Sequence, residues 1–300
     1  MSPRKISLKL LVLVFLAVAI ATSTTQAQAY PPKIKGAQEY VYKTEDGFDL
    51  KIWVFSPKEK DTPVPAMLFF FGGGWYSGSP TQFVRQCQHL AKRGMVGIVV
   101  DYRVKSRQGV RAVSCVEDAL DALRYVTTNA SKLGIDPDRI GVGGGSAGGH
   151  LAASLGTIHK DDPVAPKMMA LYNPAVVLAP LPSNFVVAPR FTGMIEEIKE
   201  RMKLKSRELS VRLGVDPVKL SPFHHVDAST PPTIIFHGTN DNVVPYAAAL
   251  VFAMQLKANG VPFDLKTYKD AGHGFFNREP YLGQTMEQLD VFLITLGWLE

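Results

Sequence analysis

The stretch Ile140-Gly141-Val142-Gly143-Gly144-Gly145-Ser146-Ala147-Gly148-Gly149-His150 decides the fold. An apolar strand runs into glycines, one serine follows, and a helical pattern begins directly after it. Gly144 and Gly148 stand two residues before and after Ser146, which is the G-x-S-x-G spacing of a strained turn between a strand and a helix. A side chain at either glycine would collide with neighbouring backbone. The spacing therefore predicts that Ser146 is an exposed nucleophile at a helix N-terminus.

A rival interpretation fits the same stretch. Gly143, Gly145 and Gly148 also match the G-x-G-x-x-G fingerprint of dinucleotide-binding folds, and Asp161 or Asp162 lies about twenty residues further on. The acidic residue of that fold ends the next strand, whereas here it precedes the next apolar run. The strand before the glycines would also open such a fold, yet here four strand patterns come before it. The glycines alone leave both interpretations open.

The rest of the chain alternates short apolar runs with longer helical patterns from Tyr40 onward. This rhythm predicts an α/β fold, with a mostly parallel eight-stranded sheet and helices on both faces. Strands are expected at residues 40–43, 50–55, 66–71, 96–101, 140–143, 168–172, 233–237 and 263–268. Helices are expected at residues 82–93, 112–133, 146–158, 247–259 and 284–296. Glu45-Asp46-Gly47 joins the first two strands into a predicted antiparallel hairpin.

Two candidate partners of Ser146 follow later strands of the sheet. Asp241 lies in the loop after the strand at 233–237, and His273 lies between two glycines after the strand at 263–268. The order serine, aspartate, histidine is that of a hydrolytic triad on an α/β sheet. In such a triad the serine attacks a carbonyl, the histidine takes its proton, and the aspartate orients the imidazole. Both partners at their expected places favour the hydrolase interpretation over the dinucleotide one.

A second glycine cluster, Gly72-Gly73-Gly74, ends an apolar strand directly before Trp75. Glycine permits unusual dihedral angles and close approach, so such a loop can aim backbone N–H groups at one point. We expect the N–H groups of Gly73, Gly74 and Ala147 to form an oxyanion hole. Trp75 and Phe275 lie beside these loops, and we expect both to contact substrate.

These motifs together resemble the α/β-hydrolase superfamily, and within it the group of hormone-sensitive lipase and the bacterial carbohydrate esterases that act on acetyl xylan or feruloyl esters. The resemblance covers about residues 38–298. It rests on the sequences Gly72-Gly73-Gly74-Trp75 and Asp101-Tyr102-Arg103, and on the loops that carry Ser146, Asp241 and His273. The family usually has a histidine directly before the three glycines, whereas this chain has Phe71, which puts the local hydrogen bonding of the loop in question.

The resemblance implies an α/β-hydrolase fold and an exported serine carboxylesterase that hydrolyses short-chain acyl esters, such as acetyl or feruloyl esters of carbohydrates. No metal or cofactor is expected. One alternative is a serine peptidase or amidase of the same fold, and another is a binding protein without catalysis. The presence of all three triad residues argues against the binding protein.

The N-terminal segment, residues 1–29, has the pattern of a secretory signal peptide. Arg4, Lys5 and Lys9 precede an uncharged apolar run of 12 residues, and Ala27-Gln28-Ala29 offers a cleavage site. A membrane span needs about 20 apolar residues, so no membrane association is expected once the segment is removed. We therefore expect a secreted or periplasmic catalytic domain at residues 30–300. Removing three basic residues lowers the formal net charge from +6 to +3, which argues against a nucleic-acid partner.

Two further expectations concern packing. Residues 161–232 are rich in proline, and we expect a cap-like insertion there, near the edge of the sheet where α/β folds bind ligands. Its mostly charged helical pattern at 196–212 fits either part of that cap or a solvated connecting helix. Cys87 and Cys115 lie in helices that are expected on one side of the sheet, so a disulfide between them is predicted.

Overall fold

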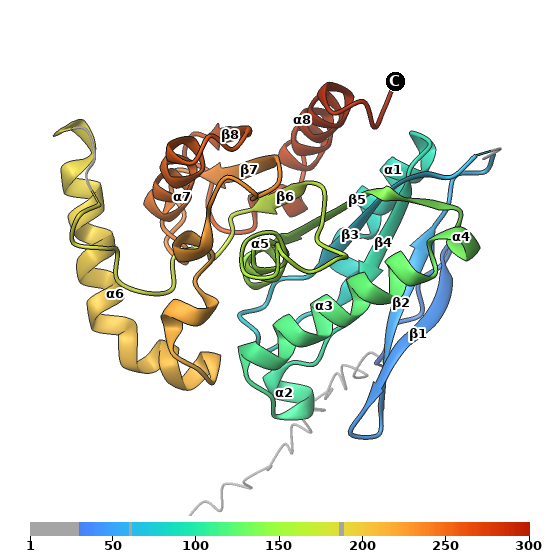
Figure 1. Cartoon of the computed structure of the whole chain (residues 1–300), viewed down its shortest axis with the longest axis horizontal. Coiled ribbons are helices and arrows are strands. Elements are labelled where there is room, and N and C mark those ends of the chain that lie inside the picture. Colours follow the sequence, from blue (N-terminus) through green and yellow to red (C-terminus); the bar gives the residue numbers. More distant parts are fainter. Residues whose placement is uncertain (1–29, 60–61, 186–188) are drawn as a thin grey trace, which may run out of the picture. The chain divides into compact units, whose positions relative to one another are not determined.

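The computed structural model describes residues 30–59, 62–185 and 189–300 (Figure 1). The predicted signal peptide, residues 1–29, lies outside the described residues. One unit spans Lys33–Glu300 and contains the helices and strands. Within the described ranges, no helix combines the length and the apolar character that a bilayer span requires.

Among the described residues, eight strands form one sheet in the order β1-β2-β4-β3-β5-β6-β7-β8. β1 pairs antiparallel with β2, and β2 pairs antiparallel with β4, while the remaining pairs are parallel. The predicted α/β sheet and its hairpin are thus confirmed. The strands are β1 Gln38–Glu45, β2 Phe48–Phe55, β3 Val64–Phe70, β4 Val96–Val100, β5 Ile135–Gly145, β6 Met169–Tyr172, β7 Thr233–Gly238 and β8 Phe263–Tyr268.

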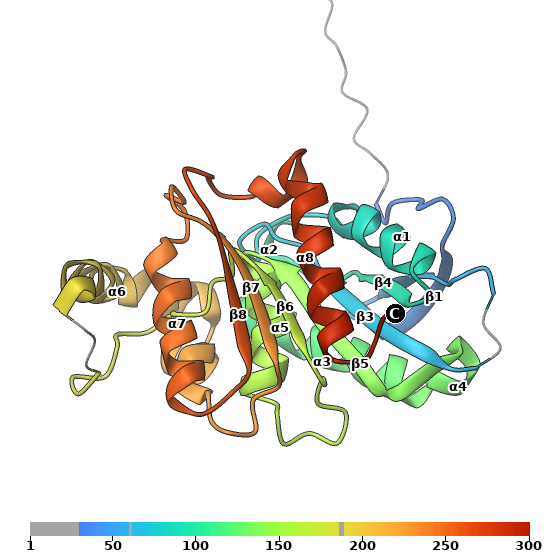
Figure 2. The same ribbon diagram turned by 90° about the horizontal axis from the view of Figure 1, so that it is seen from above.

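Helices cover both faces of this sheet. The helices are α1 Val84–Lys92, α2 Lys105–Gln108, α3 Ala112–Thr128, α4 Ala130–Leu133, α5 Ala147–Thr157, α6 Thr192–Leu213, α7 Tyr246–Ala258 and α8 Tyr281–Thr295. α1 and α8 lie on one face, and α3 and α5 lie on the other (Figures 1 and 2). Successive buried side chains of β3 point to opposite faces of the sheet. Leu68 packs in the apolar cluster of α3 and α5, and Phe69 packs in the apolar cluster of α1.

The predicted disulfide between Cys87 and Cys115 is wrong, and the strand order explains why. The chain moves from β3 to β4 in one direction across the sheet, and then from β4 past β3 to β5 in the other. Right-handed crossovers in opposite directions place their helices on opposite faces. Cys87 in α1 and Cys115 in α3 therefore lie in separate clusters, and both are buried free thiols.

The helix expected at residues 112–133 is interrupted. α3 ends at Thr128, and α4 begins at Ala130. Asn129 separates them, and its side-chain Nδ2 donates to the Tyr125 carbonyl at 2.8 Å. The backbone N–H of Asn129 donates to the same carbonyl at 3.0 Å, so Asn129 caps the last turn of α3.

The insertion begins later than residue 161, because β6 lies inside the predicted range and pairs with β5 and β7. The segment between β6 and β7 is residues 173–232, and it carries α6. One stripe of α6 is buried, at Ile195, Ile198, Met202, Leu209 and Leu213. Their spacing of three, four and seven residues is that of a single helix face. α6 packs against α7 and α3, so the solvated connecting helix is excluded.

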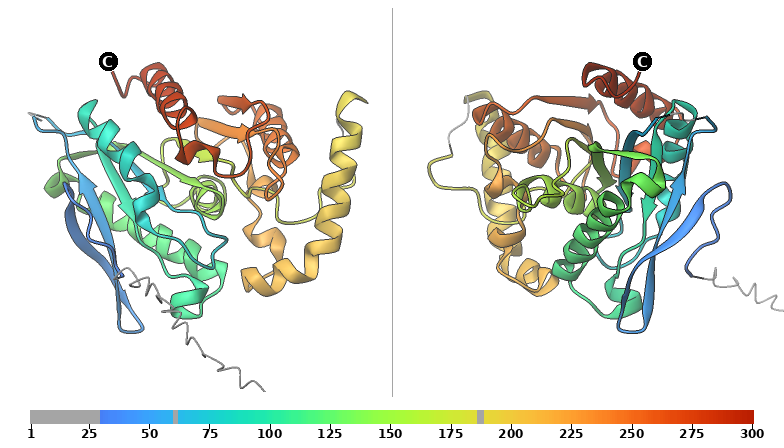
Figure 3. Two further views of the ribbon diagram at one scale, coloured as in Figure 1. Left: turned by 180° about the vertical axis from the view of Figure 1, so that it is seen from behind. Right: turned by 45° about the vertical axis from the view of Figure 1, so that its right-hand side comes forward.

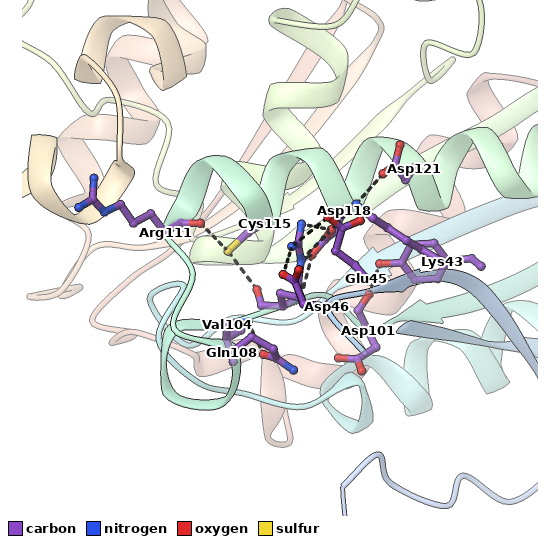
Figure 4. A network of polar contacts seen from close by, with 12 residues as sticks. Lys43, Glu45, Asp46, Asp101, Val104, Gln108, Arg111, Cys115, Asp118 and Asp121 are labelled. Atoms are coloured by element: carbon purple, nitrogen blue, oxygen red, sulfur yellow. Dashed lines mark hydrogen bonds and ion pairs between the residues drawn. The ribbon is translucent and has the colours of Figure 1, made fainter. Parts of the chain in front are cut away.

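Charged groups lock the end of β4 to α3 and to the first hairpin (Figure 4). Asp118 of α3 is fully buried and accepts hydrogen bonds from the Arg103 backbone N–H and from its guanidinium. Lys43 of β1 also binds Asp118, at 2.9 Å. Pairing of this kind is what allows a carboxylate to be buried at all. Arg103 thus has a structural role. It fixes the position of the segment after β4, which lies next to the loop Gly72-Gly73-Gly74.

Candidate active site

Ser146 lies on the turn between β5 and α5, with φ 54° and ψ −115°. Few non-glycine residues adopt such a positive φ, so the turn is strained. A Cβ at Gly144 would lie 2.5 Å from the Gly148 backbone and 2.6 Å from the Phe70 carbonyl oxygen, and a Cβ at Gly148 would overlap that same oxygen. The predicted reason for both glycines is confirmed.

The structure brings Ser146, His273 and Asp241 together in one hydrogen-bonded row. His273 Nε2 lies 3.0 Å from Ser146 Oγ, and His273 Nδ1 lies 2.7 Å from Asp241 Oδ2. The three residues come from the turns that follow β5, β7 and β8, at the carboxyl ends of parallel strands. Their geometry is that of a nucleophile, a base and an orienting carboxylate.

Asp241 is held as a carboxylate by its surroundings. Burial raises the pKa of the carboxyl, but hydrogen bonds from His237, from His273 and from the Val244 N–H outweigh this, so the pKa lies well below its usual range. Its Oδ1 accepts the backbone N–H groups of Val243 and Val244, each at 2.9 Å. The orientation of the carboxylate is therefore fixed, with Oδ2 left for His273 Nδ1–H.

The glycine loop before Trp75 is braced without the histidine that Phe71 replaces. The Gly72 N–H donates to Gln82 Oε1 at 2.6 Å, and the Tyr102 hydroxyl donates to the Phe71 carbonyl at 2.6 Å. The rings of Phe71 and Tyr102 also stack, with centroids 4.0 Å apart. Gln82 thus stabilises the loop through a hydrogen bond, and Phe71 stabilises it through ring stacking.

Trp75 is tied to the helix that follows Ser146. Its indole Nε1–H donates to His150 Nδ1 at 3.2 Å, and His150 Nε2 lies 2.7 Å from the Leu220 carbonyl. This pattern requires the tautomer with the proton on Nε2. Burial lowers the pKa of His150 to about 4, against a smaller opposing effect of the Leu220 carbonyl. His150 is therefore a neutral link between the glycine loop, α5 and the insertion.

A cavity of about 140 Å³ opens beside Ser146. Gly74, Trp75 and Ala147 line it, so two of the three predicted oxyanion donors and the predicted tryptophan face this space, whereas Gly73 does not line it. The opposite wall comes from α6 and from the loop after β7. Its apolar residues are Ile198, Met202, Leu209, Val243, Val244 and Pro245. In the parts of the chain that the structure describes, no group of three or more His, Cys, Asp or Glu side chains is placed to hold a metal ion.

The BD-FAE family model matches residues 52–256, which include Ser146 and Asp241. The chain belongs to the BD-FAE family. Esterase 2 of the Planctomycetes species Thermogutta terrifontis is 38% identical to this BD-FAE chain, and the match covers 91% of this chain and 97% of that one, with a TM-score of 0.80. Structures of that esterase are butyrate-bound, propionate-bound, phosphonylated by sarin or phosphorylated by paraoxon.

Two curated relatives are longer proteins. The probable carboxylic ester hydrolase LipM of Mycobacterium tuberculosis is 30% identical, over 69% of this chain and 48% of its own length. The probable isoprenylcysteine alpha-carbonyl methylesterase ICMEL1 of Arabidopsis thaliana is 25% identical, over 89% of this chain and 57% of its own length. The BD-FAE chain thus spans about half the length of these curated relatives.

One predicted substrate contact in the BD-FAE chain lies elsewhere. Phe275 does not line the cavity beside Ser146. Its ring contacts Tyr268, Tyr281 and Phe276, in the cluster on the α8 side of the sheet. The reason is the turn at Gly274, where φ is 74° and the chain leaves the site directly after His273.

Two residues of the site were not assigned to it in the sequence analysis. Asn173 follows β6, is buried, and its Oδ1 accepts the Gly274 N–H at 3.0 Å, which fixes the loop that carries His273. His237 lies near the end of β7, and its Nε2 is 3.4 Å from Asp241 Oδ2 and 2.9 Å from the Val244 carbonyl oxygen. Their positions at carboxyl ends of strands are the signal that marks both.

Proposed function

We propose that this chain is a serine carboxylesterase that hydrolyses short-chain acyl esters through an acyl-enzyme. One observation carries the proposal: the hydrogen-bonded row of Asp241, His273 and Ser146 ends at a cavity that is lined by apolar side chains as well as by charged ones. The names of two relatives, esterase 2 and LipM, support the same chemistry. Phosphylation of esterase 2 by organophosphates fits a reactive serine in that protein.

In the first half of the reaction, Ser146 Oγ attacks the acyl carbonyl carbon while its proton passes to His273 Nε2 over the 3.0 Å contact. The tetrahedral intermediate collapses, and His273 returns the proton to the leaving alcohol, which leaves the acyl group on Ser146. In the second half, water gives a proton to His273 and attacks the acyl carbon. The acid leaves, and Ser146 regains its proton. Asp241 stabilises the imidazolium in both halves.

Backbone donors stabilise the negative oxygen of each tetrahedral intermediate. Ala147 is the first residue of α5, so its N–H lies at the positive end of a helix dipole. Ala147 and Gly74 line the cavity with Ser146. We assign the oxyanion hole to these two N–H groups, with Gly73 as the third candidate. Removing one such donor costs roughly 100- to 1000-fold in kcat.

The cavity favours small acyl groups. Its volume of about 140 Å³ is close to the roughly 150 Å³ of a protein cavity that takes up one benzene molecule. An acetyl or butyryl group fits this space, whereas a feruloyl group contains a benzene ring with a propenoyl arm and must extend past it. We therefore propose acetyl esters of carbohydrates as the first substrate class and feruloyl esters as the second, in keeping with the bifunctional acetyl xylan/feruloyl esterases of the family.

Matched substrates test the activity. Wild type should hydrolyse 4-nitrophenyl acetate and butyrate with larger kcat/KM than 4-nitrophenyl octanoate, and it should leave 4-nitroacetanilide intact. It should also release more acetate from acetylated xylo-oligosaccharides than ferulate from feruloylated ones. Cleavage of the anilide at the rate of the ester would point to an amidase, and an optimum at eight carbons or longer would point to a lipase.

Export of the mature enzyme is also proposed. It is supported by the basic residues and the 12-residue apolar run within residues 1–29. Expression of the full chain in a bacterial host with a secretory pathway should yield a periplasmic or secreted protein that begins at Tyr30. An unprocessed chain in the cytosol would contradict the proposal.

A further inference from the structure

One wall of the cavity beside Ser146 carries a row of charged side chains from α6. Arg201, Lys205, Glu208 and Arg212 all line the cavity. They are spaced four, three and four residues apart, so they lie along a single face of the helix. At about 1.5 Å per residue the row extends roughly 16 Å. It contains three positive charges and one negative charge.

Both ends of this row are attached to the loops that form the site. Arg201 donates to the Val243 carbonyl at 2.7 Å, in the loop that carries Asp241. Arg212 donates to the Gly74 carbonyl at 3.0 Å, and its guanidinium lies 5.4 Å from the centre of the Trp75 ring. These contacts hold α6 against the cavity (Figure 3 shows α6 in yellow) and keep the row directed toward it.

Lys205 lies between the two arginines and is exposed. Among the described residues, no carboxylate or carbonyl is bonded to its ammonium group. Glu208 is the acidic member of the row, and it lies 3.8 Å from Arg212. Arg201 and Lys205 are like charges one helical turn apart, a pairing that destabilises a helix unless an anion compensates it. With three positive charges and one negative charge in the row, the wall thus presents an excess of positive charge beside Ser146.

We propose that this row binds a carboxylate on the substrate, with Lys205 as its main partner, so that the enzyme prefers esters that also carry an anionic group. Two kinds of ester meet this requirement: acetyl esters of uronic acids, in which the anion belongs to the alcohol, and half-esters of dicarboxylic acids, in which it belongs to the acyl group. The proposal rests on the esterase function proposed above and specifies its substrate class.

Two matched pairs of esters test the preference and locate the anion. For the acyl side, 4-nitrophenyl hydrogen succinate is compared with its methyl ester, and nitrophenolate release is followed. For the alcohol side, 4-acetoxybenzoate is compared with its methyl ester, and acetate release is followed. In each pair the quantity measured is the ratio of kcat/KM for the anionic ester to kcat/KM for the neutral one, which cancels any general loss of activity.

The variants are Lys205→Gln and Lys205→Glu, with Lys203→Gln as the control. Lys203 is an exposed residue of the same helix but does not line the cavity. A partly exposed ion pair changes affinity by roughly two- to fivefold, so the ratio should fall about threefold in Lys205→Gln and further in Lys205→Glu. It should stay at the wild-type value in Lys203→Gln. Raising the ionic strength to 1 M should lower the wild-type ratio, because salt screens an exposed pair.

Each outcome has a separate meaning. A reduced ratio in one pair of esters supports the proposal and places the anion on that side of the ester bond. Turnover of all four esters with the same ratios in wild type and both Lys205 variants overturns the proposal and leaves the esterase function intact. If wild type hydrolyses none of the four esters, the result contradicts the esterase function itself. The proposed substrate class then fails with it.

Discussion

Replacing Asp241 by Asn tests which ring nitrogen of His273 carries the proton. The two side chains have the same shape, so the exchange changes the hydrogen bonding and not the packing. Asp241 Oδ1 accepts two backbone N–H groups at 2.9 Å, and Oδ2 faces His273 Nδ1 at 2.7 Å. The two backbone donors require an oxygen, so the amide nitrogen of Asn must face His273. Two N–H groups would then oppose each other. His273 avoids this by carrying its proton on Nε2, where it can no longer accept the proton of Ser146.

The expected loss in kcat is about 10⁴-fold, the scale found when the same exchange imposes the wrong tautomer in a serine protease. This corresponds to about 5.5 kcal/mol of transition-state free energy. KM should change little, because Asp241 does not line the cavity. The assay is the hydrolysis of 4-nitrophenyl butyrate, with thermal unfolding of both proteins as the check on folding. A loss below tenfold in a folded Asp241→Asn protein would refute the role of Asp241 in orienting His273.

Three further predictions concern the cavity, a buried histidine and the cysteines. Met202→Ala should move the optimum of the 4-nitrophenyl ester series toward longer acyl chains, since it enlarges the apolar wall; an unmoved optimum would mean that the acyl group lies elsewhere. His150 has a folded pKa of about 4 against an ordinary 6.5, so the unfolded chain binds its proton more tightly. The loss of stability expected from His150 is about 3 kcal/mol as pH drops from 6.5 to 4. Burial lowers the pKa of His159 and His224 as well, so the free energy of unfolding of His150→Gln in urea should depend on pH less steeply than that of wild type; an equal dependence would exclude the contribution of His150. Burial raises the pKa of both Cys87 and Cys115, so iodoacetamide should leave the native protein unmodified and alkylate both thiols in urea. Mass analysis that finds a disulfide instead would contradict the strand order.

The catalytic loops were predictable because their signals are local. Gly144 and Gly148 are needed by a turn of only five residues, and Asp241 and His273 follow strands that their own apolar patterns define. In a parallel sheet the carboxyl ends of the strands meet at one edge, so their proximity follows from the fold class.

Features that depend on strand order or on side-chain direction were not predictable. The separation of Cys87 from Cys115 depends on β4 lying outside β3, which no local pattern encodes. Phe275 follows His273 by two residues, yet the left-handed turn at Gly274 directs it to the other face of the sheet.

The role of α6 was also hidden, because its buried stripe lies between charged residues that dominate its composition. The brace that Gln82 gives to Gly72 joins two segments ten residues apart and has no sequence signature.

Covalent labelling shows which residue of the chain is the nucleophile. Wild type treated with a fluorophosphonate should gain one adduct by intact mass, and peptide mapping should place it on Ser146. Ser146→Ala should gain no adduct, fold normally and lose roughly 10⁴- to 10⁶-fold in kcat. An adduct on another residue, or Ser146→Ala with the esterase activity of wild type, would mean that Ser146 is not the nucleophile.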